Sequence, residues 1–64
     1  MNIDDINNRI DELKRSILIL ETIRQEYIEQ NKDDIYISAL SDGIKYTSFR
    51  LQRYQTAHWI MANW

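Results

Sequence analysis

The stretch that decides the fold is residues 3–27, IDDINNRIDELKRSILILETIRQEY. Its apolar residues recur at alternating steps of three and four, the heptad spacing that places side chains along one seam of an α-helix. The seam positions are Ile3, Ile6, Ile10, Leu13, Ile17, Leu20, Arg24 and Tyr27. The pattern predicts a helix over about residues 3–30, with Asn2 as its N-cap and with Asp4 and Asp5 at the positive end of the helix dipole.

The second half of the chain repeats the spacing. Its seam positions are Ile37, Leu40, Ile44, Thr47, Leu51, Tyr54, His58 and Met61. They predict a second helix over about residues 34–62. The polar cluster between the two runs, Asn31-Lys32-Asp33-Asp34, suits the end of one helix and the N-cap of the next. We therefore expect a turn at residues 31–34.

A chain folded at this turn brings together residues whose numbers sum to about 64. Leu13 then faces Leu51, and Leu20 faces Ile44, so that apolar side chains meet along most of the seam. The sequence predicts an all-α fold: an antiparallel helical hairpin of two long helices, forming a single helical domain over residues 1–64.

The tripeptide Ser41-Asp42-Gly43 lies inside the second predicted helix. Glycine in a helix interior costs about 1 kcal/mol relative to alanine. Either Ser41 or Asp42 is also a suitable N-cap for a fresh helix. A continuous second helix is the favoured prediction, and a break or kink near Gly43 is the alternative.

A chain of 64 residues without cysteine and with one histidine has few ways to reinforce a small core. Disulfides are impossible and a zinc site is improbable, which leaves oligomerisation. Apolar residues outside the seam, such as Leu18, Ile19, Ile23 and Ile60, widen the apolar face of each helix. We expect two hairpins to pair as a homodimer with a four-helix bundle, and a three-helix monomer is the main competitor.

An aromatic and basic surface near the C-terminus is the candidate partner-binding site. Interface cores are rich in Trp, Tyr, Phe and Arg. The candidate residues are Tyr46, Phe49, Arg50, Arg53, Trp59, Ile60 and Trp64. The competing interpretation is that the aromatic residues fill the core of the bundle. In either case we expect Trp64 to dock against a second subunit or a target, because a free chain end otherwise frays.

The formal net charge is −2, and all ten acidic residues lie within residues 1–42. The remainder carries Lys45, Arg50 and Arg53 and no acid, which raises the question of nucleic-acid binding. Three cations supply few phosphate contacts. In the hairpin, Arg50 and Arg53 lie beside Glu12 and the other acids near the N-terminus, and we expect ion pairs that neutralise the basic segment. Nucleic acid is therefore not the favoured partner.

The chain has no motif for catalysis, for a metal or for a cofactor, and His58 has no evident catalytic partner. We expect no enzyme activity and no cofactor. The longest apolar run, Ile17–Leu20, is far shorter than the roughly 20 residues that cross a bilayer. The acidic N-terminus also lacks the basic start of a signal peptide. We expect no membrane partner and a cytoplasmic location.

The favoured function is that of a small, non-enzymatic protein–protein interaction module. It would act as an adaptor or inhibitor of a larger protein, of the kind that phages and mobile elements encode. The alternatives are a structural self-assembly subunit and a nucleic-acid-associated accessory protein.

Overall fold

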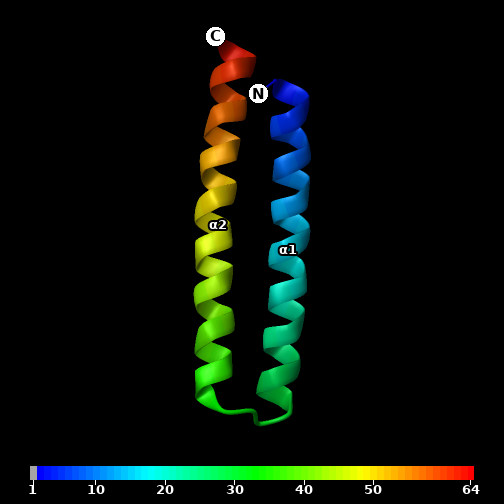
Figure 1. The fold of residues 1–64 in the computed structure, drawn as a ribbon, viewed down its shortest axis with the longest axis vertical. Helices are drawn as coiled ribbons and strands as arrows, with labels where there is room; N and C mark the ends of the chain where they lie inside the picture. The colour runs from blue at the N-terminus through cyan, green and yellow to red at the C-terminus, as the bar shows by residue number, and fades with distance from the viewer. Residues whose placement is uncertain (1) are drawn as a thin grey trace.

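A computed structural model describes residues 2–64 as two antiparallel α-helices joined by a short turn (Figure 1). Helix α1 spans Ile3–Glu29 and helix α2 spans Asp34–Asn63. The hairpin is a rod with extents of 48 × 15 × 14 Å. The last turn of α2 extends past the start of α1. The predicted all-α class and the helical hairpin are confirmed, whereas the pairing of two hairpins stays a prediction.

Both ends of α1 are closed by local hydrogen bonds. The side chain of Asn2 accepts from the backbone N–H of Asp5 at 2.9 Å, and the Asp5 carboxylate accepts from the backbone N–H of Asn2 at 3.4 Å. This capping box satisfies two N–H groups that would otherwise lack a partner inside the helix. Asn2 is thus the N-cap that the sequence predicts. The hydrogen bond that the Asp5 carboxylate accepts from Asn2 was not part of that prediction.

The C-terminal end of α1 is closed by Asn31, which has a φ of 55°. The backbone N–H of Asn31 donates to the carbonyl of Ile28 at 3.2 Å, and that of Lys32 donates to the carbonyl of Tyr27 at 3.0 Å. These two bonds form a Schellman motif, with asparagine in the left-handed position that glycine usually takes. The motif ends α1 and reverses the chain.

Helix α2 begins with Asp33 as N-cap, although the Asp33 side chain makes no capping hydrogen bond. The helix then continues without interruption through Ser41-Asp42-Gly43, as the favoured prediction has it. Gly43 is half-buried, and a Cβ at this position would lie 3.8 Å from Cδ1 of Leu20. The Thr47 hydroxyl donates to the Gly43 carbonyl at 2.7 Å.

The two helices meet in the predicted register. Opposed residues such as Leu20 and Gly43, or Arg24 and Ser41, have numbers that sum to about 64. The seam residues of α1 are all buried or half-buried, and those of α2 are half-buried except Met61, which is exposed. Only Ile6 and Leu13, at 3% and 8% exposure, are fully buried among residues 2–64. The core of the single hairpin is therefore small.

Candidate protein interaction surface

Six of the seven predicted partner-binding residues lie on α2, the seventh, Trp64, is its C-cap, and all are exposed: Tyr46, Phe49, Arg50, Arg53, Trp59, Ile60 and Trp64. Tyr46, Phe49 and Trp59 are 66%, 63% and 65% exposed, and Trp64 is fully exposed. The seam between the helices contains none of these aromatic rings. Within one hairpin they therefore do not fill a core, and Trp64 does not dock against its own chain.

The exposed residues do not form a single patch, because each residue advances about 100° around the helix. One side of the hairpin, which we name the Tyr46 face, carries Ile19, Ile23, Tyr46, Ala57, Ile60 and Trp64. Arg50 and Arg53 lie on the same side and line a hollow with Tyr54 and Ala57. The guanidinium of Arg50 lies 6.0 Å from the ring centroid of Tyr46, within the range of a cation–π contact.

The other two aromatic residues point away from α1. Phe49 and Trp59 lie on the outer side of α2, where hollows lined by Gln52 and Thr56 connect them. We name Phe49, Gln52, Thr56 and Trp59 the outer strip. Their side chains lie on one helix at steps of three or four, so they form one continuous surface. The predicted site therefore divides between the Tyr46 face and the outer strip.

The two surfaces meet at the C-terminal end of α2. Trp59, Ile60, Asn63 and Trp64 line a hollow of about 310 Å³ there. The Asn63 side chain donates to the Trp59 carbonyl at 2.8 Å and closes the last turn of the helix. Because this turn extends past the start of α1 (Figure 1), both indole rings lie where a partner can reach them.

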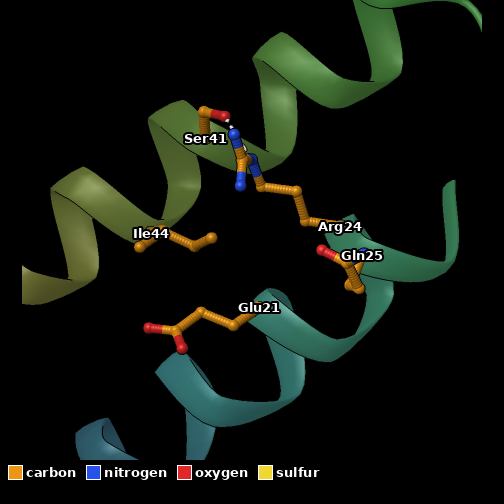
Figure 2. A pocket seen from close by; sticks show the side chains of 5 residues that line it. All are labelled: Glu21, Arg24, Gln25, Ser41 and Ile44. Carbon is orange, nitrogen blue, oxygen red and sulfur yellow. Dashed lines mark hydrogen bonds between the residues drawn. The ribbon is translucent and has the colours of Figure 1, made fainter. Parts of the chain in front are cut away.

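The side of the hairpin opposite the Tyr46 face carries a hollow lined mainly by polar side chains. Glu21, Arg24, Gln25, Ser41 and Ile44 line a hollow of about 510 Å³ on it. We name this side the Ser41 face. In Figure 2 the Arg24 side chain crosses from α1 to α2, where its Nε donates to the Ser41 hydroxyl at 2.8 Å. A guanidinium cannot take a proton from a hydroxyl, so this contact is structural and does not make Ser41 a nucleophile.

This hydrogen bond was not predicted, because Ser41 was interpreted as a possible helix start and Arg24 only as a position of the seam. The predicted register contained the signal, since the numbers of the two residues sum to about 64. A polar pair at this spacing across a hairpin seam is a candidate hydrogen bond.

The expected ion pairs of Arg50 and Arg53 with acids of α1 do not form. Among residues 2–64 the salt bridge is Arg9 with Glu12, at 3.3 Å between Nη1 and Oε2 on the surface of α1. Arg50 and Arg53 lie on the Tyr46 face of α2, and Arg50 contacts an aromatic ring instead. The prediction that this basic segment is neutralised within the hairpin is therefore wrong.

Residues 2–64 contain neither a metal-binding cluster nor a membrane-spanning helix. No group of three or more histidine, aspartate or glutamate side chains within residues 2–64 is placed to hold a metal ion. Neither α1 nor α2 is long and apolar enough to cross a membrane.

Comparisons with protein-family models, with curated proteins and with solved structures find no match to this chain.

Proposed function

We propose that this chain is a non-enzymatic protein–protein interaction module that pairs with a second copy of itself and binds a larger protein through α2. The observation that carries the proposal is the exposure of aromatic side chains on α2 and at its C-cap: Tyr46, Phe49, Trp59 and Trp64 are each more than half exposed. Aromatic residues are costly to leave in water and contribute most at interface centres.

The surface area supports self-pairing into a four-helix bundle. The hairpin exposes 5181 Å². A compact monomer of 7.8 kDa exposes about 4,400 Å². The excess of about 800 Å² matches the area that each partner buries in a standard protein interface. One interface with a second hairpin would bring the exposed area of the chain to that of a compact protein.

The outer strip is the surface that we assign to the larger protein. Phe49 and Trp59 lie on the side of α2 that faces away from the hairpin, so they remain accessible when the Tyr46 face is covered. A helix that presents two aromatic anchors one or more turns apart fits a groove on a partner. The role that we assign to the chain is that of an adaptor or inhibitor acting in the cytoplasm, of the kind that phages and mobile elements encode.

Two other functions would use the same exposed surfaces. A self-assembly subunit would consume both the Tyr46 face and the outer strip in contacts between copies. A nucleic-acid accessory protein would use Lys45, Arg50 and Arg53, since the two arginines form no ion pair within residues 2–64. Three cations give a weak, strongly salt-dependent attraction to phosphate, so this alternative ranks last.

The test of the proposal is a pair of double variants. Phe49→Ala/Trp59→Ala removes the anchors of the outer strip. Leu18→Ala/Ile35→Ala is the matched control, because it removes two equally exposed apolar side chains elsewhere. Each variant is used as bait in extract of the organism that encodes the chain, and binding of the captured protein is then measured with purified components.

The proposal predicts that the Phe49/Trp59 variant stays dimeric and loses the captured protein, while the control retains it. Loss of self-association in the Phe49/Trp59 variant would favour the self-assembly subunit instead. Salt-sensitive binding of DNA or RNA by the wild type, abolished by Arg50→Gln/Arg53→Gln, would favour the nucleic-acid function.

A further inference from the structure

We propose that the second copy docks on the Tyr46 face and runs parallel to the first, so that both turns lie at one end of the dimer and both Trp64 residues at the other. The inference rests on the proposed self-association and adds its face and its direction. It follows from the chemistry of the two sides of the hairpin and from the register of the charged residues along them.

The two sides of the hairpin differ in what a partner would bury. The Ser41 face presents Glu21, Gln25 and the Arg24–Ser41 hydrogen bond, and covering these groups without new partners costs free energy. The Tyr46 face presents Ile19, Tyr46 and Ile60, which are all exposed. Self-pairing therefore gains more apolar burial on the Tyr46 face.

The direction follows from which residues lie at the same level of the rod. In a parallel dimer, α1 of one copy lies across from α2 of the other, and residues whose numbers sum to about 64 meet between copies as they do within the hairpin. Ile19 then meets Tyr46 of the second copy, and Glu12 meets Arg53 of the second copy. In the first of these pairs apolar side chains face each other, and in the second opposite charges do.

An antiparallel dimer is less complementary. In that arrangement α1 pairs with α1, and complete overlap of Ile3–Glu29 with itself sets Glu12 against Ile19 and Arg9 against Ile23. Each charged group would lie against an aliphatic side chain and lose hydration without gaining an ionic partner. The Tyr46 face thus favours parallel pairing.

The partner of Glu12 within its own chain does not prevent the new contact. Its bond to Arg9 is 3.3 Å long, and the two side chains are 55% and 53% exposed. Exposed pairs of this type contribute little, so Glu12 is able to reach Arg53 of the second copy. Arg53 forms no salt bridge within residues 2–64, so the contact between copies gives Arg53 an acidic partner.

The first experiment is a charge exchange measured by sedimentation equilibrium. Glu12→Arg and Arg53→Glu should each raise the Kd of the dimer about tenfold, because each creates two like-charge contacts across the interface. The double variant should return to within about threefold of the wild type, since it restores both pairs. The matched controls, Asp11→Arg and Lys45→Glu, change the net charge equally but lie off the Tyr46 face and should leave the Kd unchanged.

The second experiment measures direction with a spin label on the turn. The chain has no cysteine of its own, so Lys32→Cys gives one label per chain. In a parallel dimer the two labels lie within the width of a four-helix bundle, about 20 Å. In an antiparallel dimer their separation approaches the 48 Å length of the rod.

The outcomes separate this inference from the function on which it rests. Short label distances together with rescue by the charge exchange support it. A dimer with label distances near the rod length, or a double variant as weak as the single ones, overturns the parallel arrangement and leaves self-association intact. A chain that stays monomeric at all concentrations overturns the self-association and this inference with it.

Discussion

Helices α1 and α2 are of similar length, 27 and 30 residues. They differ in the capping hydrogen bonds at their ends and in the burial of their side chains. Helix α1 has a capping box at its start and a Schellman motif at its end, and it holds both fully buried residues. Helix α2 starts without a side-chain capping bond and buries no residue completely, yet it carries Trp59 and ends at Trp64 as its C-cap. The hairpin is organised by α1, and α2 supplies the surface for partners.

The largest expected effect is on the core of α1. Leu13→Ala should lower the free energy of unfolding by about 3 kcal/mol, because it removes one of the two fully buried side chains and leaves a cavity. Leu18→Ala, on the same helix but exposed, should change it by less than about 0.5 kcal/mol. Urea denaturation followed by circular dichroism at a fixed chain concentration measures both. Equal effects would mean that the buried seam does not dominate stability.

The next test compares the closed end of α1 with the open start of α2. Asn31→Ala should cost about 1.5 kcal/mol, since alanine is strained at the φ of 55°. Asn31→Gly should be neutral to within about 0.5 kcal/mol, because glycine adopts this conformation freely. Asp33→Ala should also cost less than about 0.5 kcal/mol, because the Asp33 side chain caps nothing. Thermal unfolding ranks the stabilities of the three variants. If Asp33→Ala lowers stability as much as Asn31→Ala does, the end of α1 and the start of α2 do not differ in this respect.

A third variant asks whether α2 can be improved. Gly43→Ala should raise the free energy of unfolding by about 0.8 kcal/mol, through higher helix propensity and a less flexible unfolded chain. The new methyl group would meet Leu20 Cδ1 at 3.8 Å, an ordinary contact, so no strain offsets the gain. Chemical denaturation measures the shift. A loss of stability would show that the helices already touch as closely as they can at this level.

The smallest expected effect concerns the hydrogen bond that joins the two helices. A double-mutant cycle of Arg24→Met and Ser41→Ala should give a coupling energy of about 0.5 kcal/mol, typical of a half-exposed hydrogen bond between polar side chains. Methionine keeps an apolar stem at position 24 and limits the loss of packing. Additive effects of the two substitutions would indicate that the bond does not hold the register.

The fold was predictable because its signal is local and periodic. Steps of three and four from Ile3 to Tyr27 determine one seam, and the matching run on the other side of Asn31 determines the register. The Schellman motif was harder to foresee, since asparagine enters the left-handed conformation in some contexts only. The uninterrupted course of α2 through Gly43 was the favoured prediction, because one glycine costs a helix only about 1 kcal/mol.

The candidate surface was predictable in composition but not in arrangement. Aromatic residues outside a seam are visible in a sequence, and Trp59 and Trp64 are indeed exposed. All seven residues were predicted to form one patch, although Phe49 and Tyr46 lie on different sides of α2. Arg50 was also expected to pair with an acid, whereas its cation–π contact with Tyr46 depends on side-chain positions that spacing alone does not determine.

The protruding last turn of α2 allows intrinsic tryptophan fluorescence to report on binding at that end of the rod. The two tryptophans, Trp59 and Trp64, both line the hollow at that end, so indole fluorescence reports on one end of the rod alone. Covering that end would shift the emission to shorter wavelengths and shield it from iodide quenching, without any attached dye. A shift with rising chain concentration would locate contact between copies there, and a shift on adding a second protein would locate a foreign ligand.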